Sequence, residues 1–500
     1  MNLTPLDEHN RRLLSEAHPA DWVQPTPAPR YNLVVLGGGT AGLVAAVIGA
    51  GLGGRVALVE RALLGGDCLN FGCVPSKTLI RAARAAAAVR EAHRFGIRTP
   101  GGVEVDFGAV MERVRQVRAA ISPHDGAARM KSLGIDVFLG EGRFTAPDTL
   151  TVGQARLVFH RAILATGARA VIPDVPGLAE SGYLTHETVF NLTTQPRHLA
   201  ILGGGPIGCE LAQAFARLGT RVTLFHRHAH VLDKEDPAAA EVVQRALGRD
   251  GVEFRLNAAS LRVLGQITAG NCRVESGGET VAVDALLVAT GRRPALAGLG
   301  LEAAGVAWDS VGGLVIDDTL RTTNSRIFAS GDVCSRHQFT HAADFMSRLA
   351  VQNALFLGRR RASRLTIPRV TYTDPEIATV GLTETEAAAS GVAVSVFRRN
   401  LADVDRARTD GETEGFVKLL VAAGTDRLVG ATLVAPHAGD MIGEVGVAMA
   451  AGMGLGRLAD VIHPYPTVAE AIRQCGDQFK RTRLTPRVQS LLRRWLAWQR

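Results

Sequence analysis

A glycine-rich turn that follows an apolar stretch occurs twice in this sequence, and this repeat limits the fold more than any other feature. The first copy reads YNLVVL at residues 31–36 and GGGTAG at residues 37–42. The second has apolar residues at 199–202 and GGGPIG at 203–208. Glycines at these positions let the backbone approach a pyrophosphate at the N-terminus of the following helix. Each copy therefore predicts a dinucleotide-binding βαβ unit, and the chain is predicted to have an α/β fold.

The residue that ends the second strand of each unit distinguishes the two predicted sites. In the first unit, Glu60 follows an apolar strand at residues 55–59, and a carboxylate there can bind the ribose hydroxyls of FAD or NAD. In the second unit, the strand at residues 221–225 is followed by His226 and Arg227. An arginine attracts a 2′-phosphate, so this second site is predicted to bind NADPH, with NADH the less favoured coenzyme.

Each unit also closes with Ala-Thr-Gly after an apolar strand, at residues 165–167 and 289–291. These matching positions indicate a shared architecture, and two nucleotide sites in one chain imply two cofactors that exchange electrons. The predicted cofactor contacts are Gly37, Gly39, Gly42, Glu60, Thr166 and Gly167 in the first unit and Gly203, Gly205, Gly208, Arg227 and Gly291 in the second. Beside the second site His226, His228 and His230 alternate, but no cysteine or carboxylate completes a ligand set. They are interpreted as a polar loop beside the phosphate, and no metal site is predicted.

Composition excludes several other classes of protein. The net charge is +8, but residues 478–500 hold seven basic residues and no acidic one, so the rest of the chain is nearly neutral and no nucleic-acid partner is expected. Residues 33–54 carry no charge and are long enough to span a bilayer, but their eight glycines spell the nucleotide-binding turn instead. The first ten residues do not form a secretory signal. Six cysteines in 500 residues indicate a reducing compartment, so we expect a cytoplasmic protein in which any disulfide is catalytic.

Two cysteines, Cys68 and Cys73, lie in the segment GGDCLNFGCVPSK at residues 65–77, directly after the first nucleotide-binding unit. A single cysteine is most often a buried structural residue. Two of them in a glycine-flanked turn that opens a helix, next to a predicted flavin site, are interpreted instead as a redox-active pair. The helix N-terminus and the nearby Lys77 both favour the thiolate, which is the reactive form.

This segment resembles the redox motif of the class I pyridine nucleotide-disulfide oxidoreductases, which include dihydrolipoamide dehydrogenase, glutathione reductase and mercuric reductase. The similarity extends from residue 31 to residue 486. It implies that Cys73 is the flavin-proximal charge-transfer thiol and that Cys68 is the interchange thiol that attacks the substrate. It also implies that Lys77 lies near flavin N5 and pairs with Glu210.

The same resemblance implies FAD and NADPH as cofactors and a defined order of domains. Asp332 would hold the ribityl chain of FAD, and Gly142 would approach its adenine side. Residues 370–381 resemble the opening of the family's interface domain, which implies a homodimer. The expected parts are an N-terminal extension at 1–30, an FAD-binding domain at 31–175 and 293–365, an NAD(P)-binding domain at 176–292, an α+β dimerisation domain at 366–486 and a basic tail at 487–500.

Near the C-terminus the sequence departs from the disulfide-reducing members of this family. In those members a histidine before Pro-Thr, oriented by a glutamate, comes from the partner subunit and acts as acid and base for the interchange thiol. Here residues 463–470 read HPYPTVAE, so Tyr465 replaces that histidine while Glu470 keeps its place. A tyrosine with a pKa of about 10 is a poor base at pH 7. His463 is interpreted as a structural histidine, because the neighbouring prolines favour an extended path that aims it elsewhere.

Taken with the resemblance, these residues predict an enzyme that passes electrons from NADPH through FAD to a Cys68–Cys73 disulfide and on to an external disulfide or a thiophilic metal ion. Tyr465 places the chain closest to a mercuric-reductase-like branch. No cysteine follows Cys475, so only the inner pair could act on a metal ion. Dihydrolipoamide dehydrogenase is an alternative that Tyr465 and the missing acidic residue at His226 disfavour. A flavoprotein redox sensor without turnover is a second alternative, which the intact dithiol disfavours.

The C-terminal tail shows apolar residues at helical spacing with arginines around them. The apolar positions are Val488, Leu491, Leu492, Trp495 and Leu496. A basic amphipathic helix of this kind can make weak contact with an anionic membrane surface. It can also pack against the body of the dimer, and the sequence leaves both interpretations open.

Overall fold

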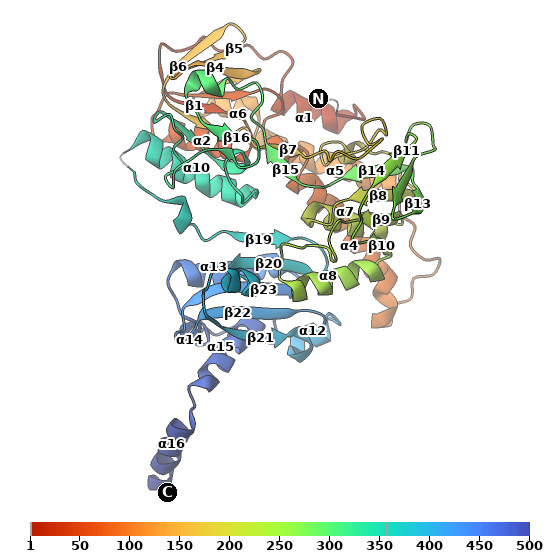
Figure 1. Cartoon of the computed structure of the whole chain (residues 1–500), viewed down its shortest axis with the longest axis vertical. Coiled ribbons are helices and arrows are strands. Elements are labelled where there is room, and N and C mark those ends of the chain that lie inside the picture. The colour runs from red at the N-terminus through yellow and green to blue at the C-terminus, as the bar shows by residue number, and fades with distance from the viewer. Residues whose placement is uncertain (1–2, 357) are drawn as a thin grey trace. The chain divides into compact units, whose positions relative to one another are not determined.

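The computed structural model describes residues 3–356 and 358–500. The chain divides into two compact structural units, which are different from the two nucleotide-binding βαβ units described above (Figure 1). The first unit comprises the chain up to Arg227 together with residues 251–365. The second unit comprises residues 228–250 and 366–500. The short segment 228–250 therefore groups with the C-terminal part of the chain, although both of its neighbours in sequence belong to the first unit.

The first unit contains a seven-stranded sheet, built from β1 (Tyr31–Leu36), β2 (Val56–Glu60), β3 (Ile135–Leu139), β4 (Gly142–Ala146), β5 (Thr149–Val152), β6 (Ala155–Leu164) and β18 (Ile327–Ala329). The order is β3-β2-β1-β6-β5-β4, with β18 beside β6, and β1 is parallel to both of its neighbours. Leu33 and Val35 of β1 enter one apolar core, whereas Val34 and Leu36 enter another. The sheet is thus covered on both faces, which explains the nearly continuous apolar sequence of β1.

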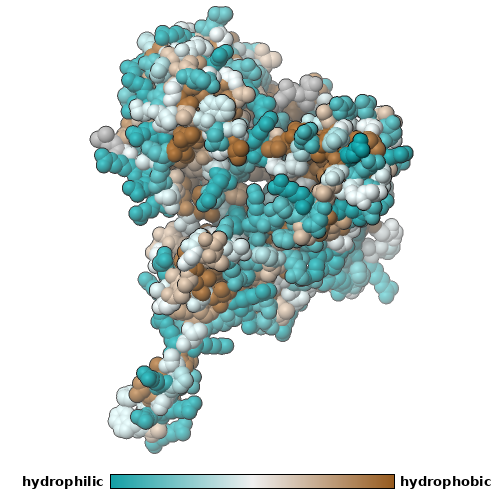
Figure 2. All heavy atoms as spheres, in the orientation of Figure 1, coloured by the Kyte–Doolittle hydropathy of each residue, from teal (hydrophilic) through white to brown (hydrophobic). Residues whose placement is uncertain are grey.

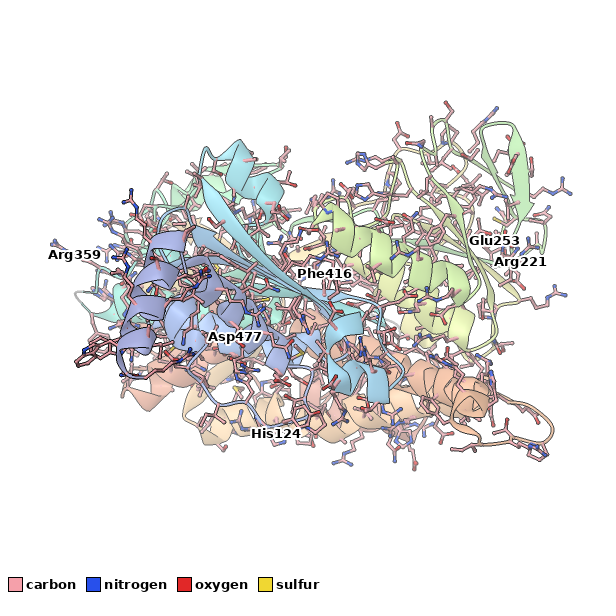
Figure 3. All side chains as sticks on the ribbon, turned by 90° about the horizontal axis from the view of Figure 1, so that it is seen from below. His124, Arg221, Glu253, Arg359, Phe416 and Asp477 are labelled. Atoms are coloured by element: carbon pink, nitrogen blue, oxygen red, sulfur yellow. The ribbon has the colours of Figure 1, made fainter. Side chains whose placement is uncertain are left out.

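A second parallel sheet in this unit has the order β10-β9-β8-β14. Its strands are β8 (His198–Leu202), β9 (Arg221–Phe225), β10 (Val252–Arg255) and β14 (Ala285–Val288). On the adjacent strands β9 and β10, the Nε of Arg221 donates to the carboxylate of Glu253 at 2.9 Å (Figure 3). Smaller antiparallel pairings join β7 (Ala168–Ala170) to β15 (Arg292–Pro294), β16 (Trp308–Asp309) to β17 (Gly313–Leu314), and β11 (Arg262–Leu264), β12 (Arg273–Ser276) and β13 (Glu279–Ala282) to one another.

Helices follow the glycine-rich turns and cover the sheets. The small residues of α2 (Thr40–Gly51) let it lie close to β1, since a Cβ atom at Gly49 would be 3.0 Å from the side chain of Leu33. Helix α10 (Thr340–Leu355) is tied to α2 by Ser347, whose Oγ donates to the carbonyl oxygen of Ala41 at 2.8 Å. The helices of this unit are α1 (Glu8–Ala17), α2 (Thr40–Gly51), α3 (Gly66–Asn70), α4 (Cys73–Glu91), α5 (Phe107–Ile121), α6 (Ala127–Ser132), α7 (Pro206–Arg217), α9 (Leu301–Ala304) and α10 (Thr340–Leu355).

The second unit is built on a five-stranded antiparallel sheet of order β19-β20-β23-β22-β21. Its strands are β19 (Pro368–Thr371), β20 (Glu376–Gly381), β21 (Val394–Asn400), β22 (Phe416–Ala422) and β23 (Leu428–Ala435). Its helices are α8 (Pro237–Arg249), α11 (Glu384–Ala389), α12 (Asp405–Thr409), α13 (Ala438–Ala450), α14 (Leu455–Leu458), α15 (Glu470–Thr482) and α16 (Pro486–Trp498). This mixture of an antiparallel sheet and separate helices is the α+β arrangement predicted for the C-terminal domain.

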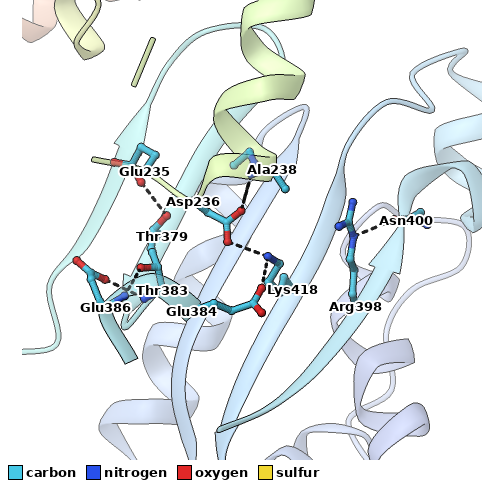
Figure 4. Close-up of polar contacts among 11 residues, drawn as sticks. Glu235, Asp236, Ala238, Thr379, Thr383, Glu384, Glu386, Arg398, Asn400 and Lys418 are labelled. Carbon is cyan, nitrogen blue, oxygen red and sulfur yellow. Dashed lines mark hydrogen bonds and ion pairs between the residues drawn. The ribbon is translucent and has the colours of Figure 1, made fainter. Parts of the chain in front are cut away.

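A buried lysine ties α8 to this sheet. Lys418 on β22 is 5% exposed, and its Nζ donates to the carboxylate of Asp236 at 2.8 Å and also to that of Glu384 (Figure 4). Asp236 is the N-cap of α8 and accepts from the backbone N–H of Ala238 at 3.0 Å. A second contact lies nearby, where Arg369 donates to the carboxylate of Glu235 at 3.0 Å. These charge-assisted hydrogen bonds explain why segment 228–250 groups with the C-terminal sheet.

The C-terminal tail forms the predicted helix. Thr485 caps α16 by accepting from the backbone N–H of Val488, and residues 481–500 are all exposed. Apolar and polar side chains lie next to one another on its surface (Figure 2). Residues 33–54, the one long uncharged stretch of the sequence, form β1 and α2 rather than a single helix. Within the described residues, no helix combines the length and the apolar character that a membrane span requires.

Candidate active site

Both predicted nucleotide-binding turns enter the left-handed region of backbone conformation, and each passes directly against the Ala-Thr-Gly segment of its own sheet. Gly37 has a φ of +111°, and a Cβ atom there would lie 2.3 Å from the carbonyl oxygen of Ala165. Gly203 has a φ of +116°, and its Cβ would lie 2.3 Å from the carbonyl oxygen of Ala289. No side chain fits at either position. Two motifs that the sequence shows separately are thus in contact, at the strand ends where such sheets bind nucleotides.

The residues that end the second strands hold corresponding positions. In the first copy, the backbone N–H of Gly38 donates to the Glu60 carboxylate at 2.5 Å. In the second, the backbone N–H of Gly204 donates to Nδ1 of His226 at 3.0 Å. His226 is buried, so it takes the structural place of Glu60 instead of belonging to a polar loop with the other histidines. Arg227, the next residue, is exposed.

The other glycines predicted to contact the cofactors fall into two groups, according to whether a Cβ atom at that position would meet another atom. Three are required by close packing, because a Cβ atom at Gly42, Gly208 or Gly142 would lie 1.7, 1.9 or 2.5 Å from the nearest atom. For Gly142 that atom belongs to Leu36, so core packing accounts for this glycine and its adenine contact stays a prediction. Thr166 donates to the carbonyl oxygen of Ala295 at 2.9 Å. Open space surrounds the Cβ positions of Gly167, Gly205 and Gly291. Glycine-lined space beside the turns fits dinucleotide cofactors.

The segment that carries the cysteines is built directly onto the first nucleotide-binding turn. The backbone N–H of Gly65 donates to the carbonyl oxygen of Gly38 at 2.9 Å. Gly66 has a φ of +55°, and a Cβ atom there would lie 2.5 Å from the Cα of Gly39. Glycines on both sides of this contact let the two backbones touch. The structure therefore places the dithiol next to the site predicted for FAD.

Cys68 lies in α3, and Cys73 is the first residue of α4, where the helix dipole favours negative charge. Both are free thiols. The pKa of the Cys73 thiol is lowered to about 6, chiefly by a hydrogen bond from Cys68, while Thr340 and Lys77 also lower it and burial opposes the shift. The hydroxyl of Thr340 lies 3.2 Å from the Sγ of Cys73. The same contact with Cys73, together with burial, raises the pKa of Cys68. The pair therefore favours a single negative charge, located on Cys73.

Lys77 and Glu210, which were predicted to pair, lie together. The Nζ of Lys77, one turn after Cys73 on α4, is 2.9 Å from the carboxylate of Glu210 on α7. The Glu210 side chain is 7% exposed, so its charge needs this partner. The pair thereby brings a fixed positive charge near the dithiol.

Asp332, predicted to hold the ribityl chain, belongs to a partly buried network of charges. Arg292 lies 3.3 Å from the carboxylate of Asp332 and 3.0 Å from that of Asp67, the residue before Cys68. The Nε2 of His186 lies 3.0 Å from the same Asp67 carboxylate. Burial opposes ionisation of Asp67, but His186 and Arg292 lower its pKa overall. Burial raises the pKa of Asp332, with Arg292 opposing this effect.

The C-terminal motif lies in the second unit. The hydroxyl of Tyr465 donates to the carboxylate of Asp405 at 3.1 Å, and this hydrogen bond raises the pKa of the phenol. Glu470 is held by Arg473, whose Nη2 lies 2.7 Å from its carboxylate. The Nε2 of His463 lies 2.9 Å from the Glu444 carboxylate, and its interpretation as a structural histidine stays a prediction.

Sequence reasoning missed Thr340, Asp67, His186 and Arg292. Arg292 directly follows the second Ala-Thr-Gly segment, and Asp67 directly precedes Cys68, so position within the motifs was the available signal for these two. His186 and Thr340 approach the dithiol only through folding, and no local pattern marks them.

Two regions of the chain match known families. Residues 31–347 match the family described as pyridine nucleotide-disulphide oxidoreductase, and residues 367–475 match its dimerisation domain. The chain belongs to this family. The predicted resemblance and fold class are therefore confirmed, and so are the predictions of a flavoprotein oxidoreductase and of FAD and NAD(P)H as its cofactors. The dimerisation domain of this oxidoreductase supports a homodimer.

Similar proteins include several with assigned names. The oxidoreductase is 36% identical to a mercuric reductase of Bacillus cereus over 445 residues, which cover 89% of this chain and 70% of that protein. It is 34% identical to a dihydrolipoyl dehydrogenase of Bacillus subtilis (strain 168) over 471 residues, covering 90% and 98%. Among solved structures, the Cu(II) complex of a HOCl-induced flavoprotein disulfide reductase, RclA, from Escherichia coli gives a TM-score of 0.79 at 32% identity, covering 88% of this chain and 98% of that one.

Proposed function

We propose that this oxidoreductase uses Cys68 and Cys73 to deliver electrons from NADPH to a thiophilic metal ion, as a mercuric reductase does, or to an external disulfide. The observation that carries the proposal is the position of the dithiol segment against the first nucleotide-binding turn, where the backbone N–H of Gly65 donates to the carbonyl oxygen of Gly38 at 2.9 Å. There Cys68, Thr340 and Lys77 lower the pKa of the Cys73 thiol, which favours its thiolate. Thiolates are the ligands that soft metal ions prefer. The similarity to mercuric reductases and to the Cu(II) complex of the Escherichia coli flavoprotein favours the metal ion.

Each residue of the site has a proposed part in this reaction. The glycine turn at 37–42, Glu60 and Asp332 would hold FAD, which when bound supplies the redox centre between nicotinamide and dithiol. Cys73 would hold the negative charge next to that centre, with Lys77 stabilising it. Cys68 would keep its proton until a substrate arrives, and would then lose that proton and attack the substrate as a thiolate. Reduction of one divalent mercury ion to the metal takes two electrons, so one NADPH is consumed and one proton is released.

NADPH is the coenzyme that we propose for the second site. Arg227 is exposed and directly follows the buried His226 after this strand, a position where an arginine attracts a 2′-phosphate. No carboxylate occupies the place that Glu60 holds in the first copy, which removes the usual partner of a free 2′-hydroxyl.

The predicted domain boundaries and the cytoplasmic location stay predictions.

Tyr465 is the residue that argues against a dihydrolipoamide dehydrogenase. Its hydroxyl donates to Asp405, and this raises the pKa of the phenol, so even less of the phenolate that could act as a base is present at pH 7 than in a free tyrosine. A redox sensor without turnover is the alternative from another class. The similarity to proteins named mercuric reductase and dihydrolipoyl dehydrogenase favours a catalyst over a sensor.

A panel of electron acceptors tests the proposal. Purified holoenzyme with NADPH is assayed against Hg(II), Cu(II), glutathione disulfide, lipoamide and a soluble quinone. We expect metal-dependent NADPH oxidation that Cys68→Ser and Cys73→Ser abolish, and a long-wavelength charge-transfer band that only Cys73→Ser removes. Full activity in both single variants would contradict the assignment of the dithiol. If NADPH reduces the enzyme but the enzyme passes electrons to none of these acceptors, the redox-sensor alternative would be favoured.

We further propose that α16 makes weak contact with an anionic membrane surface. Its apolar residues Leu491, Trp495 and Trp498 are 64%, 57% and 77% exposed, and the two tryptophan rings lie against each other on this exposed helix. Seven basic residues and no acidic one lie at 478–500, and such a segment is attracted to anionic lipid headgroups. Tryptophan favours the membrane interface. The helix lies flat on that surface in this proposal, because 13 residues are too few to cross it.

Sedimentation with lipid vesicles tests this contact. We expect the holoenzyme to bind vesicles that contain phosphatidylglycerol, and not neutral phosphatidylcholine vesicles, with binding lost in a chain ending at Leu484. The variant Trp495→Ser with Trp498→Ser should weaken binding without changing the charge. If the shortened chain instead changes its oligomeric state and binds vesicles as the full chain does, α16 packs within the dimer.

A further inference from the structure

The guanidinium of Arg118, on α5, is fully buried and joins two segments that lie far apart in the sequence. Its Nη1 donates to the backbone carbonyl oxygen of Asn70 at 2.8 Å, and its Nη2 donates to Oδ1 of Asn10 at 3.0 Å. All three residues are 0% exposed. Burial of a charged group is costly unless its donors are hydrogen-bonded, so the position of this guanidinium depends on both partners.

Asn70 lies in the turn between Cys68 and Cys73 and holds that turn in shape. Its side-chain Nδ2 donates to the carbonyl oxygens of Leu64 and Gly66, at 3.1 and 2.8 Å. The backbone of Asn70 is therefore anchored by Arg118, while its side chain folds the preceding residues around it. A displacement of Arg118 would therefore act on the backbone of Asn70, between the two cysteines.

Asn10, the other partner, belongs to helix α1 of the N-terminal extension. Its Nδ2 donates to the carbonyl oxygen of Pro5 at 2.7 Å, which turns its Oδ1 toward Arg118. Because α1 is preceded by Asp7 as its N-cap, the position of Asn10 is set within the first turn of the helix. The extension thus supplies a well-oriented acceptor to a buried charge.

The extension reaches the redox turn by a second route. The carbonyl oxygen of Ala17, at the end of α1, accepts from the backbone N–H of Leu64 at 3.1 Å. Leu13 and Ala17 also share one apolar core with Leu69 and Phe71, which flank Asn70 between the two cysteines. A polar bridge and an apolar contact therefore connect the same two segments.

We propose that the N-terminal extension is part of the active site, in which Asn10 acts through Arg118 as a positioning residue for the Cys68–Cys73 turn. The family match begins only at residue 31, so this element lies outside the common part of the fold. The inference rests on the proposed role of the two cysteines. The extension then does more than cover the surface of the first unit, because without it the buried guanidinium of Arg118 would lose its hydrogen bond to Asn10.

Substitution of Asn10 in the full-length holoenzyme tests this inference. Asn10→Leu removes the acceptor, and we expect the charge-transfer absorbance of the NADPH-reduced enzyme and its kcat to fall about three- to tenfold. The KM for NADPH should not change, because the second glycine turn lies on a different sheet. Asn10→Asp keeps an acceptor for Arg118 and should restore both quantities.

Trp22→Phe is the matched control. It removes another hydrogen bond of the extension, from the indole Nε1 to the carbonyl oxygen of Val137 at 3.0 Å, but it does not touch the redox turn. We expect it to lower the melting temperature and leave the charge-transfer band unchanged. If Asn10→Leu does not fold, Asn10→Ala carries the same expectation. An unchanged band in the folded Asn10 variant, or an equal loss in Trp22→Phe, would overturn the inference. A wild-type enzyme without the band would overturn the dithiol assignment first, and the inference with it.

Discussion

The Nζ of Lys77 lies 2.9 Å from the Oε2 of Glu210, although 133 residues separate them in the sequence. Lys77 follows the two cysteines on α4, and Glu210 follows the second glycine turn on α7. The pair therefore connects the helix that begins at Cys73 with the helix that begins at the predicted NADPH site. Its positive charge lies close enough to the dithiol to lower the pKa of Cys73.

Removal of that charge should change the pH at which the charge-transfer band appears. The Cys73 thiolate, with a pKa of about 6, is present above that pH and is lost as the pH falls through it. Lys77→Met should move the midpoint upward by about one pH unit, because an opposite charge is lost. Absorbance of the two-electron-reduced enzyme between pH 5 and 8 measures this midpoint. Lys77→Met with Glu210→Gln should show the same shift, since it leaves no unpaired carboxylate; an unshifted midpoint in both would exclude Lys77 as the cause.

Arg227→Ala should lower the preference for NADPH over NADH. A charge-assisted contact to phosphate is worth about 1.5–3 kcal/mol, so we expect kcat/KM for NADPH to fall about 10- to 150-fold while that for NADH changes little. Arg221→Ala is the matched control, because it removes an arginine of the same strand region that pairs with Glu253. A natural preference for NADH that Arg227→Ala does not affect would contradict the proposal.

Local sequence patterns were sufficient for the nucleotide-binding units and for the dithiol. The turn at Gly37 needs a left-handed backbone and close contact with Ala165, and only glycine meets both requirements, so the pattern is visible in the sequence. The pairing of Lys77 with Glu210 was predicted through family resemblance, not from local physics. The likeness of His226 to Glu60 as a hydrogen-bond acceptor appears only in the structure.

Contacts between distant segments could not be predicted in this way. Thr340 reaches Cys73 across 267 residues, and Arg118 joins Asn10 to Asn70 from a third segment. Arginine on an amphipathic helix normally lies in solvent, so a fully buried Arg118 runs against the usual preference. The segment 1–30 was therefore predicted only as an extension before the first domain, without its contact with the redox turn.

Lys418→Ala should destabilise the second unit strongly. The substitution leaves Asp236, whose side chain is 3% exposed, with a buried carboxylate and no cation. Loss of one partner of a buried ion pair costs about 3–5 kcal/mol. Lys480→Ala is the control, because the Lys480 side chain is 41% exposed and surface pairs contribute about 1 kcal/mol or less. Urea denaturation of the holoenzyme measures both, and equal losses would show that Lys418 is not an essential partner.

The replacement of the family's histidine by Tyr465 should make this enzyme a poor disulfide reductase. Glutathione disulfide and lipoamide turnover needs an acid and base for the interchange thiol, whereas reduction of the dithiol by NADPH does not. We therefore expect rapid reduction by NADPH in stopped-flow measurements and slow steady-state turnover with either disulfide. Strong lipoamide activity in the natural protein would contradict this interpretation of the C-terminal motif.

Tyr465→His should raise disulfide turnover, because an imidazole titrates near pH 7 and a phenol held by Asp405 does not. Positioned acid–base groups contribute about 10²–10⁴-fold, so even a poorly aligned histidine should give a measurable gain of about tenfold. The gain depends on orientation, and here Glu470 is already engaged by Arg473. Tyr465→His combined with Arg473→Gln should therefore give faster disulfide turnover than Tyr465→His alone if Glu470 is the residue that orients the ring.

Tyr465→Phe separates the two substrate classes. If Tyr465 assists a bound metal ion, loss of the hydroxyl should slow Hg(II)-dependent NADPH oxidation more than it slows disulfide reduction. Equal slowing of both reactions would show that the hydroxyl has no particular part in metal reduction.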